Sequence, residues 1–104
     1  MGNYQKINPL KTNSIESKKV YLIGGGIASL AAAAYLIRDG HMAGKNITIL
    51  EETHVLGGGM DGAGDAEQGY IIGGGRELEE HYECSWDLFS FIPSLNKSQQ
   101  NSFG

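Results

Sequence analysis

Residues 19–51, KVYLIGGGIASLAAAAYLIRDGHMAGKNITILE, decide how this chain folds. A short apolar run at 19–23 stops at three glycines, which is typical of a buried parallel strand. Apolar residues then recur at spacings of three and four from Ile27 to Ile37, which predicts a helix that ends at Gly40. Residues 46–50 predict a second strand. The order strand, glycine turn, helix, strand predicts one βαβ unit of about thirty residues.

The glycine turn after the first strand follows the dinucleotide fingerprint G-x-G-x-x-G, with Ser29 in the last place. The fingerprint requires Gly24 for the tight turn, Gly26 for close approach of the backbone to a pyrophosphate, and a small residue at 29 for helix–strand packing. The pyrophosphate would lie on the first N–H groups of the helix, among which is that of Ala28. The alternative is a glycine-rich turn that binds no ligand.

Glu51 ends the second strand, about twenty-five residues after the fingerprint, where a carboxylate can accept a hydrogen bond from a ribose hydroxyl. Because a carboxylate would repel a 2′-phosphate, this position favours FAD or NAD. The glycine loop that follows favours FAD, since such a loop is common in flavoproteins with two dinucleotide sites. We predict that Gly59 and Met60 meet the phosphates or the ribityl chain of the flavin; the alternative is an ordinary flexible loop.

Beyond the second strand, glycine-rich stretches alternate with short elements. Residues 57–64 (GGGMDGAG) are too rich in glycine for a regular element, so we expect a loop that lies against another part of the molecule. A turn at 65–69, a strand at 70–72 and a third glycine turn at 73–75 are predicted next. A helix should then run from Arg76 until Pro93 ends it.

These elements predict an α/β fold, namely the opening βαβ of a doubly wound, Rossmann-like FAD-binding domain with an incomplete sheet. The domain should cover residues 18–93. A polar leader at 1–17, expected to be disordered, precedes it, and a polar tail at 94–104 follows. Both faces of a parallel sheet need cover, so we expect exposed apolar surface unless the rest of the protein or a partner covers it.

Charge and cysteine content exclude several classes of protein. Eight Lys and Arg against twelve Asp and Glu, with no long basic run, argue against nucleic-acid binding. A single cysteine, Cys84, and the lack of a secretory leader pattern favour a cytoplasmic setting. The longest apolar stretch, 27–37, is about half the length needed to cross a bilayer.

The third glycine cluster opens the most distinctive part of the sequence. It reads GYIIGGGRELEEHYEC at 69–84 and WDLF at 86–89, and MDGAG stands at 60–64. These segments resemble the oleate hydratase family, also called myosin-cross-reactive antigen. With the fingerprint, the resemblance is continuous from about Lys18 to Leu95.

Oleate hydratases add water across the cis double bond of oleic acid to give 10-hydroxystearic acid, and they need FAD although no electrons are transferred. The resemblance implies that Glu77 positions and activates the water as a general base, while a separate acid supplies the proton. In the family that acid is a tyrosine much farther along a longer chain. The resemblance further implies Gly75 and Arg76 as FAD contacts, an unsaturated fatty acid as substrate, and a homodimer for full-length members.

We therefore expect an N-terminal, FAD-binding part of a hydro-lyase that is inactive alone. Two departures from the family bear on the conformation of the water-positioning loop: Gly73 stands where the family generally has arginine, and Leu78 where it often has methionine. The alternatives are part of another FAD-dependent oxidoreductase, of the amine-oxidase or desaturase type, or a non-enzymatic remnant.

Several residues near the predicted second helix have plainer interpretations. Glu77 could simply be an acid favoured in the first turn of a helix, and Arg76 could simply be solvated. Glu77, His81 and Cys84 have helical spacing that would suit metal ligands, but packing or solvation is the preferred interpretation. Trp86 and Phe89 are expected in the core or in peripheral contact with a membrane.

Overall fold

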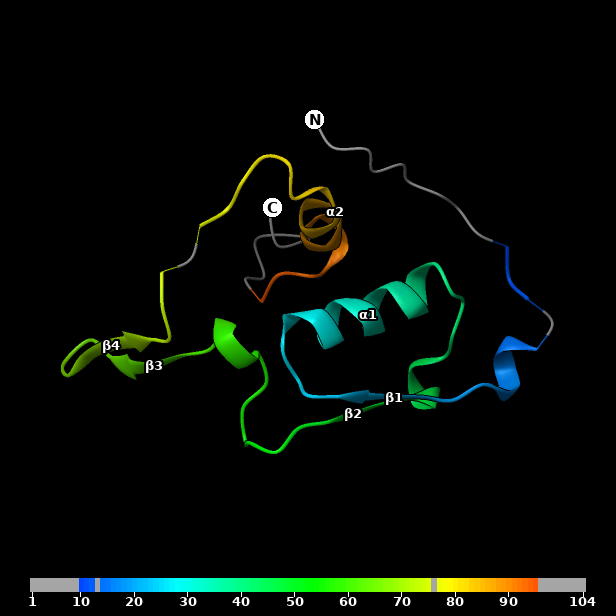
Figure 1. Ribbon diagram of the computed structural model, residues 1–104, viewed down its shortest axis with the longest axis horizontal. Coiled ribbons are helices and arrows are strands. Elements are labelled where there is room, and N and C mark those ends of the chain that lie inside the picture. The colour runs from blue at the N-terminus through cyan, green and yellow to red at the C-terminus, as the bar shows by residue number, and fades with distance from the viewer. Residues whose placement is uncertain (1–9, 13, 76, 96–104) are drawn as a thin grey trace. The chain divides into compact units, whose positions relative to one another are not determined.

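The computed structural model describes residues 10–12, 14–75 and 77–95 (Figure 1). The described residues form two compact units, one on each side of position 76. The first unit contains two small sheets and one long helix, and the second contains one short helix. The prediction of a single domain at 18–93 is not tested by this division and stays a prediction.

The predicted βαβ unit is present. Strand β1 (Val20–Ile23) leads into helix α1 (Ile27–Arg38), and strand β2 (Ile47–Leu50) pairs parallel to β1 in a register that joins Val20 to Ile47. Asn46, predicted in the second strand, instead ends a 3-10 turn, η2 (Gly44–Asn46). Another 3-10 turn, η1 (Ile15–Ser17), precedes β1 within the predicted leader.

The helix ends just before Gly40, as predicted. Glycine is needed at this position because of close packing and not because of a left-handed backbone. The N–H groups of Asp39 and Gly40 both donate to the carbonyl of Tyr35, at 2.8 and 3.2 Å. A Cβ at Gly40 would lie 2.7 Å from the carbonyl oxygen of Leu36, so only glycine fits. The left-handed conformation falls instead on His41, with φ 56°.

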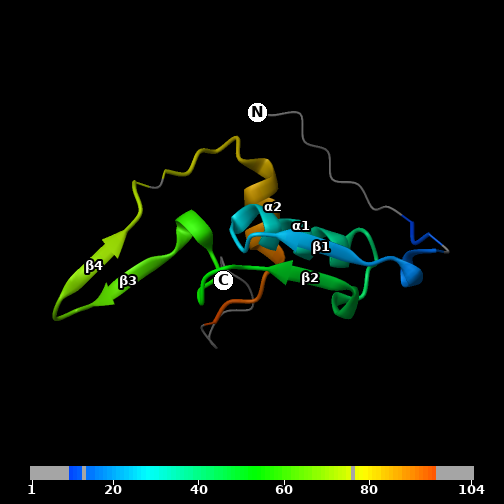
Figure 2. The same ribbon diagram turned by 60° about the horizontal axis from the view of Figure 1, so that its bottom comes forward.

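The two faces of the β1–β2 sheet differ in burial. Helix α1 runs back along the strands on one side (Figures 1 and 2). Along β1, Val20 and Leu22 are half-buried, whereas Tyr21 and Ile23 are 62% and 80% exposed. The expectation that an incomplete sheet leaves apolar surface exposed is therefore confirmed. A doubly wound sheet goes beyond these two strands and stays a prediction.

The expectation of an irregular loop at 57–64 is wrong for most of its length. Gly58–Met60 forms the 3-10 turn η3, and strand β3 (Gly62–Asp65) pairs antiparallel with β4 (Gly69–Ile72), which contains the predicted strand at 70–72. The predicted turn at 65–69 makes this possible, since Oδ1 of Asp65 accepts the N–H groups of Glu67 and Gln68 at 2.9 and 2.7 Å. The glycines in β3 also allow close pairing: a Cβ at Gly64 would collide with the carbonyl of Gly69.

The second predicted helix begins later than expected. Helix α2 (Glu83–Phe91) starts at Glu83 and not at Arg76, and residues 77–82 form no helix. The carbonyl of Glu79 accepts the N–H of Tyr82 at 3.1 Å and the indole N–H of Trp86 at 3.0 Å, so it does not accept the helical bond from Glu83. The predicted end is confirmed: after Phe91, Ile92 is extended (φ −72°, ψ 129°), as the residue before a proline prefers.

Candidate dinucleotide-binding site

The glycine turn joins the carboxyl end of β1 to the first turn of α1. Gly24 has a left-handed backbone, with φ 88°, and its N–H donates to the carbonyl of Leu50 at 2.7 Å. A side chain is disfavoured at such a φ, which explains the first glycine of the fingerprint. The chain therefore turns sharply at the point where the two parallel strands end, which is where open α/β sheets bind their ligands.

Gly26 and the residues after it leave open space in front of the helix. Gly26 is the N-cap of α1, and its carbonyl accepts the N–H of Leu30 at 3.0 Å. No atom lies within 4 Å of the position that a Cβ of Gly26 would occupy. Ala28 is exposed and Ser29 half-buried. These residues fit a pyrophosphate, because the space is open and the N-terminus of a helix favours an anion.

Glu51 reaches back across the glycine turn. Its Oε2 accepts the N–H of Gly25 at 2.6 Å, and its Oε1 accepts both the N–H and the hydroxyl of Thr53 at 3.2 Å. The hydrogen bond from the Gly25 N–H, followed by that from the Thr53 N–H, holds the pKa of this carboxyl below its ordinary value. Glu51 is therefore a charged acceptor at the place where the sequence predicts a ribose.

Gly25 is the residue of this site that sequence reasoning missed. Its N–H is bonded to Glu51, and its carbonyl accepts the N–H of Gly57 at 2.7 Å. A Cβ at Gly25 would lie 2.5 Å from Cδ2 of Leu56 and 3.0 Å from Oε2 of Glu51. The fingerprint allows any residue at this position, so the only available signal was a third glycine where two were sufficient.

The second glycine cluster lies against the first, as expected. Gly57 forms a parallel bridge with Gly26, and a Cβ at Gly58 would lie 3.1 Å from the Cα of Gly26. The predicted FAD contacts Gly59 and Met60 are in η3, where Gly59 has open space around its Cβ position and Met60 is 47% exposed. The structure therefore brings the 24–26, 51 and 57–60 segments together.

The remaining predicted residues lie outside this cluster. Gly75 has no atom within 4 Å of its Cβ position, and Arg76 lies outside the described residues. Glu77 is exposed and belongs to the second unit. Because Glu77 precedes α2 and Glu83 is the acid in its first turn, the helix-dipole interpretation of Glu77 is wrong. Its role as a general base stays a prediction.

The metal-ligand interpretation loses its geometric basis. Glu77 and His81 precede α2, so a helical spacing does not place them on one face with Cys84. Over residues 10–12, 14–75 and 77–95, no three His, Cys, Asp or Glu side chains gather as metal ligands would. No helix in the same ranges is long and apolar enough to span a membrane.

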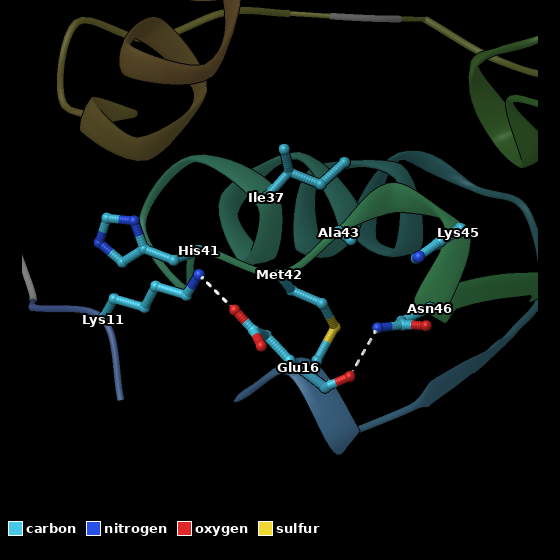
Figure 3. Close-up of a pocket in the computed structure, with 8 residues that line it drawn as sticks. All are labelled: Lys11, Glu16, Ile37, His41, Met42, Ala43, Lys45 and Asn46. Atoms are coloured by element: carbon cyan, nitrogen blue, oxygen red, sulfur yellow. Dashed lines mark hydrogen bonds and ion pairs between the residues drawn. The ribbon is translucent and has the colours of Figure 1, made fainter. Parts of the chain in front are cut away.

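A hollow of about 510 Å³ lies at the other end of α1 (Figure 3). Ile37, Met42 and Ala43 form its apolar part, and Lys11 is paired with Glu16 at 2.9 Å. The hollow is next to η1 and η2, at the amino ends of the strands, whereas nucleotides bind at the carboxyl ends. The glycine turn is therefore the better candidate for a nucleotide site.

Comparison with known proteins points to one family. A family model described as the MCRA family matches residues 17–103. The chain is 47% identical over 95 residues to an oleate hydratase of Streptococcus pyogenes serotype M49 (strain NZ131), covering 90% of this chain. It is 34% identical over 99 residues to a linoleate hydratase of Lactiplantibacillus plantarum, covering 76% of this chain. In both matches the chain spans 16% of the length of the relative.

Proposed function

The chain belongs to the MCRA family, and we propose that it is the N-terminal, FAD-binding part of a fatty-acid hydratase. The observation that carries this proposal is the cluster at the carboxyl ends of β1 and β2, where Glu51 is bonded to the turn and the space at Gly26 is open. Both relatives named above are hydratases of unsaturated fatty acids. Their names support the hydratase over the amine-oxidase or desaturase alternative.

The residues of the cluster have distinct roles toward the dinucleotide in this proposal. The backbone from Gly26 to Ser29 binds the pyrophosphate, and Glu51 accepts a hydrogen bond from the adenosine ribose. Gly59 and Met60 face the flavin phosphates or the ribityl chain, and Gly75 and Arg76 contact the cofactor from the segment beyond the β3–β4 hairpin. Hydration transfers no electrons, so bound flavin would not act as an oxidant. It would supply a surface that shapes the substrate site.

The proposed reaction adds water across a cis double bond. Glu77 takes a proton from the water as the water oxygen bonds to one alkene carbon, while an acid elsewhere in the protein protonates the other carbon. For oleate the product is 10-hydroxystearate. Cytoplasmic localisation, homodimerisation and peripheral contact with a membrane that supplies the fatty acid belong to the same proposal.

A titration of the chain with FAD tests the cofactor assignment. Flavin fluorescence and far-UV circular dichroism are followed together in the wild type, in Gly26→Ala and in Gly44→Ala. No atom lies within 4 Å of the Cβ position of Gly26, and at Gly44 the nearest atom is Cδ1 of Ile37 at 3.8 Å, so both variants should keep the fold. Only Gly26→Ala puts a methyl group where the pyrophosphate would lie, and we expect its Kd for FAD to rise about tenfold or more.

Gly44→Ala is the control. Gly44→Ala lies in η2, at the amino ends of the strands, and should bind FAD like the wild type. Equal weakening in both variants, or wild-type binding by Gly26→Ala, would contradict the assignment of the glycine turn. Steady reduction of an added electron acceptor by the flavin complex would instead favour an oxidoreductase.

A further inference from the structure

The carboxylate of Glu51 is held from two directions. Both donors of Thr53 bind the same oxygen, since its N–H and its hydroxyl each lie 3.2 Å from Oε1, while the Gly25 N–H binds Oε2 at 2.6 Å. A carboxylate offers about four acceptor positions, so these three donors leave about one of them, on Oε2, and the backbone N–H of Glu52 interacts with the carboxylate more weakly. The Thr53 donors thus fix the orientation in which the carboxylate faces the glycine turn.

The hydroxyl of Thr53 also connects Glu51 to the next part of the chain. Its oxygen lies 3.0 Å from the carbonyl oxygen of Val55, and its single proton is therefore shared between two acceptors. The residue after Val55 is Leu56, the side chain that lies against Gly25. Thr53 is exposed, so these contacts are not a consequence of burial in a core.

We propose that Thr53 is a positioning residue for Glu51. By holding Oε1 with two donors, Thr53 orients the carboxylate so that Oε2 binds the Gly25 N–H and keeps one acceptor position for a ribose hydroxyl. This inference rests on the proposed FAD binding for its effect on affinity. The holding of Glu51 itself is a property of the chain without ligand.

Few titratable side chains lie near Glu51 along the chain or in the glycine turn that it contacts. The neighbouring titratable residues along the chain are Glu52 and His54, and the glycine turn that receives the carboxylate has no charged side chain. The contributions that lower the pKa of Glu51 all come from N–H and O–H donors: Gly25, Thr53 and, more weakly, the backbone of Glu52. Removing one of these donors should therefore raise that pKa.

The test compares Thr53→Val, which removes the hydroxyl but keeps the shape and the N–H, with Thr53→Ser, which keeps the hydroxyl. The matched control is Thr48→Val, on the exposed face of β2. NMR follows the Glu51 carboxyl and the Gly25 amide proton through a pH titration. We expect the pKa of Glu51 to move up toward its ordinary value in Thr53→Val only, with far-UV circular dichroism unchanged in all three variants.

The second readout is FAD affinity. Thr53→Val leaves Glu51 less well oriented toward the ribose hydroxyl, and the most that it can lose is the one hydrogen bond between them. One such bond corresponds to about a two- to tenfold change in Kd, so Thr53→Val should bind FAD up to about tenfold more weakly. Thr53→Ser and Thr48→Val should bind like the wild type. In a Glu51→Ala background, Thr53→Val should cause no further loss, because its effect passes through Glu51.

The outcomes separate this inference from the proposed function. An unchanged pKa in Thr53→Val overturns the inference, and so does a raised pKa with unchanged FAD affinity. Absence of FAD binding in the wild type contradicts the proposed function. In that case the pKa of Glu51 alone decides whether Thr53 holds this carboxylate: it should be raised in Thr53→Val and unchanged in Thr53→Ser. The inference is also overturned if Thr53→Val weakens FAD binding by the same factor in the Glu51→Ala background as in the wild type.

Discussion

At the scale of the residue, Glu51 connects the carboxyl end of β2 to the turn after β1. Its bond to Gly25 joins two positions that are 26 residues apart. Gly25 in turn binds Gly57, so one small residue holds both the acid and the second glycine cluster. The same tight fit explains why Gly25 has no room for a Cβ. A larger residue at position 25 would therefore displace the Leu56 and Glu51 side chains.

The lowered pKa of Glu51 predicts a loss of stability in acid. Because the folded-state pKa lies below the unfolded value, the ionised carboxylate stabilises the fold above the unfolded pKa, and this contribution disappears as the pH falls through the folded pKa. Urea unfolding at about pH 7 and about pH 3 should show a smaller pH dependence in Glu51→Gln than in the wild type.

Glu16→Gln is the control for this measurement. Lys11 also lowers the pKa of Glu16, but that ion pair is exposed and should contribute little to stability. We expect Glu16→Gln to keep nearly the full pH dependence of the wild type. If the free energy of unfolding depends on pH as strongly in Glu51→Gln as in the wild type, the bond between Glu51 and Gly25 does not contribute to this pH dependence.

At the scale of the element, turns decide where the short elements begin and end. The β3–β4 hairpin forms from a glycine-rich stretch because Asp65 binds two backbone N–H groups in the connecting turn. All eight strand residues of this hairpin are exposed, so packing contributes little to it. Likewise, α2 starts only at Glu83, because the indole of Trp86 and the N–H of Tyr82 occupy the carbonyl of Glu79.

Asp65→Ala should therefore loosen the hairpin. Loss of the two hydrogen bonds should cost about 1–3 kcal/mol in local stability, because each such bond contributes about 0.5–1.5 kcal/mol. Hydrogen exchange at the amides of 69–72 should become faster, while exchange in β1 and β2 stays the same. Glu67→Ala, in the same turn, is the control. It removes the Glu67 side chain but keeps the backbone N–H that donates to Asp65, so it should leave the exchange rates unchanged.

At the scale of the whole molecule, the β1–β2 sheet has one packed and one open face. Tyr21, Ile23 and Leu50 are between 50% and 80% exposed on strands whose alternate residues are half-buried. Among the described residues, Met42 and Leu88 are the buried hydrophobic side chains. The chain spans 16% of the length of its hydratase relatives, and the open face is the surface that further chain or a partner would cover.

A matched pair of variants measures the difference between the faces. Ile23→Thr, on the open face, should change the free energy of unfolding by no more than about 0.5 kcal/mol. Leu22→Thr, on the half-buried face, should cost about 1–3 kcal/mol. Urea unfolding gives both values, and light scattering should show less self-association for Ile23→Thr. Equal costs would contradict the burial difference.

The sequence by itself determined the elements whose signals are local. Apolar runs, helical spacing and stop residues placed β1, α1, β2 and the end of α2 close to where they lie, because neighbouring residues in the chain set these patterns. The fingerprint likewise located the glycine turn and the acid at Glu51, and the block at 69–89 pointed to the family.

Only the tertiary structure decided how these pieces meet. Hydrogen bonds between distant backbone and side-chain groups leave no periodic pattern, so the bonds that join Glu51 and Gly57 to Gly25 could not be predicted. For the same reason the start of α2 was placed too early, since it depends on a side chain seven residues beyond Glu79. Pattern fixes what each segment is; contact between segments fixes where the candidate site forms.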